Sequence, residues 1–121
     1  MEKEQINQLL DKQRQYFYSG ATLDLDFRIS ALKRLRASIR KHEDQIHAAL
    51  KKDLGKSNME SYMCEIGLTL SELTWMEKHI RRLTREKRVP TPLAQFAARS
   101  FQSPTPYGTV LIMSPWNYPV L

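Results

Sequence analysis

The sequence predicts an α/β protein in which a helical amino-terminal region precedes the start of a parallel sheet. Over the first 89 residues, apolar side chains recur every three or four positions, the spacing of one face of an α-helix. Pro90 and Pro92 end this pattern. The later apolar run TVLIM, residues 109–113, has the length and the β-branched composition of a buried strand. As it stands, the chain should be mostly helical, with a sheet strand close to Leu121.

Three helices are expected before the prolines. The first has a loose apolar stripe over residues 6–17 and ends at a Ser-Gly breaker. The second is capped by Asp24 or Thr22 and stops at Gly55, with basic residues at its negative end. The third begins at Asn58 as its cap and continues as one regular stripe.

The chain divides into a helical segment (residues 1–89), a linker with a candidate edge strand (residues 90–108) and a strand with a turn (residues 109–121). A strand covered on both faces needs neighbouring strands and helices packed over them. Since there is at most one other strand candidate, the partners must come from beyond Leu121 or from another chain. We therefore expect the front part of a larger α/β protein.

Composition is that of an ordinary globular protein, with 41% hydrophobic and 26% charged residues. A single cysteine excludes an internal disulfide framework and favours a reducing compartment. The charged start MEKEQINQLLDKQRQ lacks the apolar region of a secretory signal. The longest apolar run is too short to span a bilayer. These features predict a cytoplasmic protein that does not associate with membranes.

The net charge of +6 raises the question of an anionic partner. Basic residues do cluster on the second and third helices, but acidic residues lie between them, and no aromatic residues alternate with them to stack bases. A solvated helix face is therefore favoured over a nucleic-acid interface. The competing interpretation is a self-standing basic helical module that binds acidic partners and has no catalytic activity.

Other candidate side chains favour structural roles. Cys64 adjoins the apolar stripe and precedes an acidic residue, so a packed, inert thiol is favoured over a nucleophile. His42, His47 and His79 do not have the spacing of metal ligands, and we expect no metal site. The four glycines stand singly, which excludes a glycine-rich phosphate loop.

The segment SPWNYP differs from these candidates because it follows the predicted strand directly. Pro115 fixes the direction in which the chain leaves the sheet, and Pro119 suits the first position of a new helix. Asn117 thus presents an amide at the carboxyl end of a strand, where ligands bind in open α/β sheets. A capping role for Asn117 at the next helix is equally compatible with this local chemistry.

The stretch SPTPYGTVLIMSPWNYPVL (residues 103–121) resembles the aldehyde dehydrogenase superfamily, in particular its class 3-like branch. It is similar to the family's proline-tyrosine-glycine turn, apolar strand and Trp-Asn-Tyr-Pro signature. Residues 27–73, which include DLGKS, look like the family's amino-terminal helix, the corner after it and the following helix. The resemblance covers nearly the whole chain and identifies it as an amino-terminal piece.

This resemblance implies a fold and an activity. Residues 109–121 would be the first strand and turn of a Rossmann-like domain that binds NAD or NADP. The whole enzyme would oxidise aldehydes to carboxylic acids through a thiohemiacetal and a thioester on a downstream cysteine that this chain lacks. Asn117 matches the family's oxyanion-hole donor, a role in which an amide can contribute about 3 kcal/mol.

The resemblance also implies further contacts. Met113, Ser114, Pro115 and Trp116 would lie beside the nicotinamide and ribose of the cofactor, and Tyr118 would line the approach of the aldehyde. More weakly, the helix around Cys64, Glu65 and Leu68 would come near the substrate tunnel. The whole enzyme would be a homo-oligomer, a dimer in the class 3-like branch. The isolated chain should be inactive because its nucleophile is absent.

Overall fold

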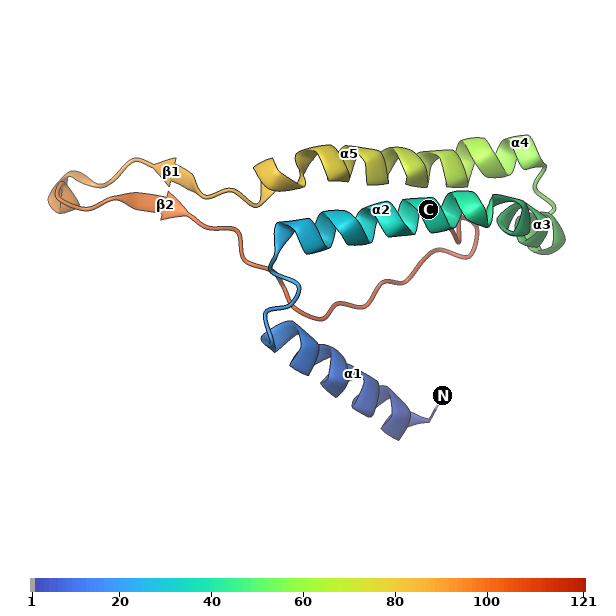
Figure 1. Ribbon diagram of the computed structural model, residues 1–121, viewed down its shortest axis with the longest axis horizontal. Helices are drawn as coiled ribbons and strands as arrows, with labels where there is room; N and C mark the ends of the chain where they lie inside the picture. Colours follow the sequence, from blue (N-terminus) through green and yellow to red (C-terminus); the bar gives the residue numbers. More distant parts are fainter. Residues whose placement is uncertain (1) are drawn as a thin grey trace.

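Two long helices lie side by side and form the centre of the molecule (Figure 1). The computed structural model describes residues 2–121. Its helices are α1 (Lys3–Tyr18), α2 (Leu25–Lys41), α3 (Glu43–Leu54), α4 (Asn58–Ser61), the π-helical turn η1 (Tyr62–Ile66), α5 (Gly67–Leu83) and the short 3-10 helix η2 (Leu93–Gln95). The strands are β1 (Lys87–Val89) and β2 (Ser100–Gln102). Helix α2 packs along α5, whereas α1 diverges from this pair (Figure 1).

Helix α2 starts where the sequence predicts, but it ends earlier. Asp24 is the cap, and its carboxylate accepts hydrogen bonds from the backbone of Asp26 at 3.4 Å and Phe27 at 2.8 Å. The expected single helix up to Gly55 is wrong, because the backbone leaves helical geometry at His42 (φ −106°, ψ 17°). The chain then starts α3 after His42, and α3 ends at Gly55 in the left-handed conformation (φ 69°).

The third expected helix is present as three contiguous pieces, α4, η1 and α5, which we call the composite helix (residues 58–83). Its cap is Ser57 rather than Asn58: the Ser57 hydroxyl accepts a hydrogen bond from the Glu60 backbone at 3.2 Å. Within η1 the Gly67 N–H donates to the Tyr62 carbonyl five residues earlier. One extra residue is thereby accommodated in this turn, which changes the direction of the side chains around it.

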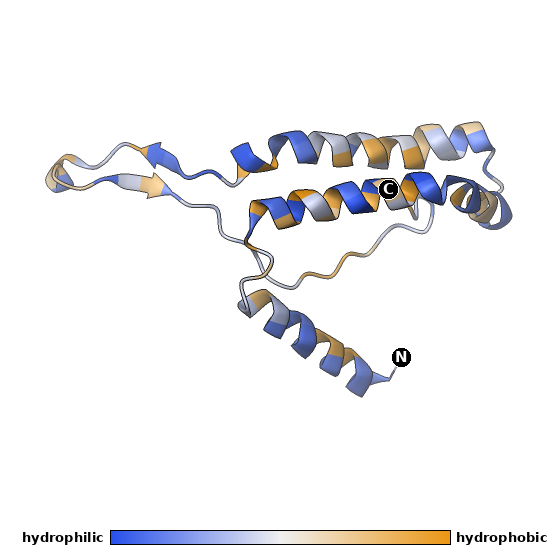
Figure 2. Cartoon of the chain, viewed as in Figure 1, coloured by the Kyte–Doolittle hydropathy of each residue, from blue (hydrophilic) through white to orange (hydrophobic). Residues whose placement is uncertain are grey.

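The hydrophobic core is small and centred on the composite helix. Its buried apolar residues are Leu50, Ile66, Leu70, Leu73 and Ile80. The chain exposes 10192 Å², whereas a compact monomer of 14.2 kDa exposes about 6,800 Å². Much apolar surface therefore faces solvent, including parts of α1 and α2 (Figure 2).

A β-hairpin extends away from the helices (Figure 1). Strands β1 and β2 are antiparallel, with Arg88 opposite Phe101 at the centre of the pair. Strand β2 lies within residues 90–108, the linker in which the sequence offers a candidate edge strand. By contrast, β1 lies in the segment that the sequence assigns to helix.

The predicted strand at residues 109–113 is not formed. These residues run as an extended chain, and Leu111, Ile112 and Met113 are each more than 80% exposed. A strand requires a hydrogen-bonded neighbour, and the sheet among residues 2–121 consists of β1 and β2 alone. Within residues 2–121, no helix has the length and the apolar character needed to cross a bilayer.

Candidate functional site

The segment after the extended chain folds into a turn that the helices hold in place. We call residues 115–120 the WNYP turn. It is closed by the Tyr118 N–H, which donates to the Pro115 carbonyl at 3.2 Å. Trp116 and Asn117 occupy the two central positions of this turn. The Asn117 side chain is exposed, so its amide is available to a ligand.

Three side chains fix the backbone of the WNYP turn. The Lys56 ammonium donates to the Asn117 carbonyl at 2.8 Å. The Glu65 carboxylate accepts a hydrogen bond from the Val120 N–H at 2.9 Å. The Thr69 hydroxyl lies 3.2 Å from the Val120 carbonyl and 3.0 Å from the Glu65 carbonyl one helical turn earlier, and it shares its one proton between these two acceptors. All three bonds are made to main-chain atoms, which leaves the side chain of Asn117 free.

Lys56 and Glu65 also bind each other. The Lys56 Nζ lies 2.5 Å from Glu65 Oε1, and it lies 4.2 Å from the centroid of the Tyr118 ring. Glu65 is fully buried and Lys56 is 9% exposed. A buried carboxylate is strongly unfavourable without a partner, so Lys56 is the compensating charge that permits the burial of Glu65.

The hydrogen bond and the negative charge of Glu65 raise the pKa of Lys56 above its ordinary value of 10.5. Burial acts in the opposite direction, because it disfavours the charged ammonium, but the carboxylate outweighs it. Lys56 is therefore a cation at neutral pH and can serve both acceptors, Glu65 and the Asn117 carbonyl.

Local sequence features explain where this pair lies. Gly55 adopts φ 69° and turns the chain out of α3, so that Lys56 follows the corner directly. Ser57 then caps the composite helix. Glu65 belongs to the π-helical turn η1, which Gly67 permits: a Cβ at this position would lie 2.8 Å from the Tyr62 carbonyl oxygen.

The residues predicted to form the site lie together on one exposed stretch. Met113 is 83% and Trp116 is 89% exposed, Ser114 and Pro115 are also exposed, and Tyr118 is 39% exposed. The structure brings Asn117 and Tyr118 to Lys56. Cys64 is half-buried on η1. The carboxylate of Glu65 faces Lys56 and Val120, and Leu68 is 46% exposed.

Sequence reasoning missed Lys56 and Thr69 and gave Glu65 no partner. The available signals were weak: a lysine directly after a helix-stopping glycine, and a glutamate at the border of an apolar stripe. Neither signal indicates the other, because nine residues separate them and the extra residue in η1 shifts the helical phase.

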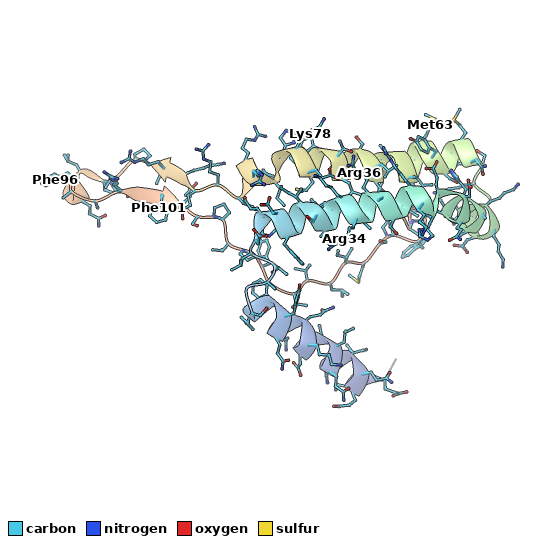
Figure 3. The ribbon with its side chains drawn as sticks, viewed as in Figure 1. Arg34, Arg36, Met63, Lys78, Phe96 and Phe101 are labelled. Carbon is cyan, nitrogen blue, oxygen red and sulfur yellow. The ribbon has the colours of Figure 1, made fainter. Side chains whose placement is uncertain are left out.

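The basic helix faces are partly neutralised within the fold. Arg36 on α2 pairs with Glu77 on α5 at 3.0 Å, and Arg81 on α5 pairs with Asp26 on α2. Figure 3 shows Arg36 directed from α2 towards α5. Among residues 2–121, groups of three or more His, Cys, Asp or Glu side chains with the geometry of a metal site do not occur.

An apolar hollow of about 600 Å³ lies between α1, α2, α5 and the start of the extended segment. It is lined by aromatic and aliphatic side chains such as Phe17, Phe27 and Val110. None of the residues of the WNYP turn borders it. The hollow is therefore separate from the candidate site.

The helices, hairpin and WNYP turn together reproduce part of a known enzyme fold. The structure described as the substrate-bound state of Staphylococcus aureus AldH superposes with a TM-score of 0.92 and 40% sequence identity, over 95% of this chain and 25% of that chain. The model of the aldehyde dehydrogenase family matches residues 1–121, and the chain belongs to this family.

Curated relatives place the similarity in the class 3 branch, as the resemblance implied. The chain is 40% identical over 114 residues to the 4,4'-diaponeurosporen-aldehyde dehydrogenase of Staphylococcus aureus, covering 94% of this chain and 25% of the relative. It is 33% identical over 115 residues to aldehyde dehydrogenase family 3 member B1 of Homo sapiens, covering 95% and 25%. The chain thus spans about a quarter of the length of these relatives.

Proposed function

We propose that this chain is the amino-terminal part of an NAD(P)-dependent aldehyde dehydrogenase that oxidises aldehydes to carboxylic acids. Family membership and the names of the relatives support the reaction class. The observation that bears most directly on mechanism is the exposed amide of Asn117 on a turn whose backbone is fixed by Lys56, Glu65 and Thr69.

Asn117 is proposed as a donor of the oxyanion hole. When a nucleophile attacks an aldehyde carbonyl, negative charge develops on the oxygen, and a donor that is already oriented stabilises this charge without reorganising. The side-chain amide of Asn117 has two N–H donors. Its backbone is held by the hydrogen bond from Lys56 at 2.8 Å, so the peptide that bears the amide does not have to reorient at the transition state.

Residues 113–116, which precede Asn117, have side chains that could contact one end of a nicotinamide cofactor. Met113 and Trp116 offer exposed apolar faces for a flat heterocycle, and Ser114 offers a hydroxyl for a sugar. Together with Pro115 they would hold the nicotinamide-ribose end of NAD or NADP, which accepts the hydride when bound. Tyr118 would line the path of the aldehyde.

The covalent step is assigned to a cysteine outside this chain. Its thiolate would attack the aldehyde carbonyl, hydride would leave to the cofactor, and water would release the acid from the thioester. Cys64 is half-buried on η1 and is proposed as a packing residue. A homo-oligomeric, dimeric enzyme in the cytoplasm stays a prediction from the sequence and the family resemblance.

Replacing Asn117 by Ala in the whole dehydrogenase tests this role. We expect kcat to fall by about 10²–10³-fold, the effect of removing one oxyanion donor, while KM for the cofactor changes less than twofold. The matched control is Asn58→Ala, because Asn58 is also an exposed asparagine but lies on the first turn of α4. A variant Asn117→Ala with the turnover of the parent enzyme would remove Asn117 from the oxyanion hole.

The alternative of a basic interaction module has less support. The WNYP turn is bonded to the helices rather than left free, and Arg36 and Arg81 are engaged by acidic residues within the fold. Membership of the aldehyde dehydrogenase family favours the enzyme.

A further inference from the structure

We propose that the buried pair Lys56–Glu65 is a positioning device for Asn117, so that both residues act on catalysis through the orientation of the WNYP turn. This inference rests on the proposed oxyanion role of Asn117 and adds two residues that do not themselves touch substrate.

Connectivity is the first observation. Lys56 bonds simultaneously to Glu65 Oε1 at 2.5 Å and to the Asn117 carbonyl at 2.8 Å, while the other carboxylate oxygen of Glu65 accepts from Val120 at 2.9 Å. The pair therefore holds the turn on both sides of Pro119, at the residue that bears the amide and at the residue after the proline. A rotation of the Asn117 peptide would break the bond to Lys56.

Burial is the second observation. Glu65 is fully buried, and its two oxygens are bonded to Lys56 and to the Val120 N–H. Reorienting this carboxylate is unfavourable, because loss of Lys56 would leave its charge uncompensated and loss of the Val120 N–H would leave a buried oxygen without a donor. The WNYP turn is thus anchored to a buried residue of the composite helix and not to a mobile surface side chain.

The π-helical turn is the third observation. Such turns cost a regular hydrogen-bonding pattern and are frequent at functional sites. Here it lies at the Glu65 segment, and the absence of a Cβ at Gly67 permits the close approach to the Tyr62 carbonyl. Glu65 lies within this turn, and its carboxylate faces Lys56 and Val120.

The choice of main-chain atoms is the fourth observation. Lys56, Glu65 and Thr69 bond to a carbonyl, an N–H and a carbonyl of the turn, and none of these bonds uses the Asn117 amide. The turn is fixed while the amide stays free to bind a ligand. A misplacement of catalytic groups by 1 Å can cost about 100-fold in rate, so a holder of this kind affects turnover without contacting the substrate.

A double-mutant cycle in the whole dehydrogenase tests the proposal, because residues that act through one another are not additive. The readout is the single-turnover rate of formation of reduced nicotinamide, which excludes product release. Glu65→Gln should lower this rate about tenfold in the parent enzyme and less than twofold when Asn117→Ala is already present. KM for the aldehyde and for the cofactor should change less than twofold.

The matched control is Glu72→Gln, a change of an exposed carboxylate on the same composite helix that should leave the rate within twofold of the parent. Thermal unfolding of every variant verifies that the fold is intact. If Glu65→Gln does not fold, Thr69→Val takes its place in the cycle. It removes the hydroxyl that bonds to the Val120 carbonyl and to the Glu65 carbonyl but leaves the Lys56–Glu65 pair in place, and we expect a reduction of about threefold that disappears in the Asn117→Ala background.

The outcomes separate the two proposals. The positioning role would be overturned if Glu65→Gln lowered the rate equally in the parent and in the Asn117→Ala background, or did not lower it at all. Asn117 would remain an oxyanion donor in either case. A normal rate in Asn117→Ala would overturn the oxyanion role and the positioning role together. If Glu65→Gln lowers the single-turnover rate only when Asn117 is present, and the KM values are unchanged, the result supports both the oxyanion role and the positioning role.

Discussion

Lys56 is the residue at which the helices and the WNYP turn meet. Its ammonium bonds to a carboxylate and to a backbone carbonyl, and the Tyr118 ring lies 4.2 Å away on another side. An arginine would place a planar fork here, whereas the compact ammonium can direct donors to partners that lie in different directions. The compact shape of the Lys56 ammonium is therefore as important as its charge.

The raised pKa of Lys56 gives a specific pH dependence. A cationic group whose pKa is raised in the folded protein contributes stability that is complete below its unfolded pKa, near 10.5, and is lost as pH rises through the folded value. We expect the difference in free energy of unfolding between the parent and Lys56→Met/Glu65→Gln to be constant from pH 7 to pH 9 and to shrink above 10.5.

Urea unfolding of both proteins across this range measures the difference. The double variant is the appropriate reference because it removes both charges and leaves neither one buried without a partner. A difference that grows between pH 7 and pH 9 would show that desolvation outweighs Glu65 and lowers the pKa of Lys56, because the folded protein would then release this proton at a lower pH than the unfolded chain.

At the scale of the elements, the composite helix depends on one glycine. A Cβ at Gly67 would lie 2.8 Å from the Tyr62 carbonyl and 3.2 Å from the Tyr62 ring, so the π-helical turn would have to shift. Gly67→Ala should lower the free energy of unfolding of the whole dehydrogenase by about 1–3 kcal/mol, although alanine is otherwise the better helix former.

Thermal or denaturant unfolding verifies this expectation, with Ser71→Ala as the control. Ser71 is exposed on α5, and its replacement should change the free energy of unfolding by less than about 0.5 kcal/mol. If Gly67→Ala stabilised the protein, helix propensity would outweigh the clash and the π-helical turn would not be required.

The same elements show what the sequence can and cannot predict. Periodicity located α1, α2 and the composite helix, because their apolar stripes follow the 3.6-residue repeat. It did not detect the break at His42, since Ile39 and Ile46 are seven residues apart and keep the same phase across it. It also missed η1, because one inserted residue leaves the apolar spacing nearly regular.

At the scale of the whole molecule, the prediction of Asn117 as a site residue depended on a family signature, whereas the partners of the WNYP turn did not follow from sequence. Lys56 and Asn117 are far apart in the chain and meet only through the fold, and the same holds for Glu65 and Val120. The strand predicted for residues 109–113 failed for a related reason. Its apolar composition was read correctly, but strand formation depends on a neighbour rather than on composition.

The same dependence predicts the behaviour of the 121-residue chain in isolation. With aldehyde and NAD or NADP it should give no rise in the absorbance of reduced nicotinamide, because Asn117 is present while Cys64, its single cysteine, is half-buried on η1. Hydrogen exchange should be rapid at residues 110–113, whose chain is extended and exposed, and slow at Ile66 and Leu70 in the core.

The whole dehydrogenase is the positive control for both measurements, because neighbouring strands there would protect residues 110–113. An aldehyde-dependent absorbance rise from the isolated chain would refute the assignment of the nucleophile to a cysteine elsewhere. Slow exchange at residues 110–113 in the isolated chain would show instead that this segment finds a strand partner in another copy. Its exposed edge makes such pairing the natural competitor, since unpaired N–H and C=O groups recruit other strands.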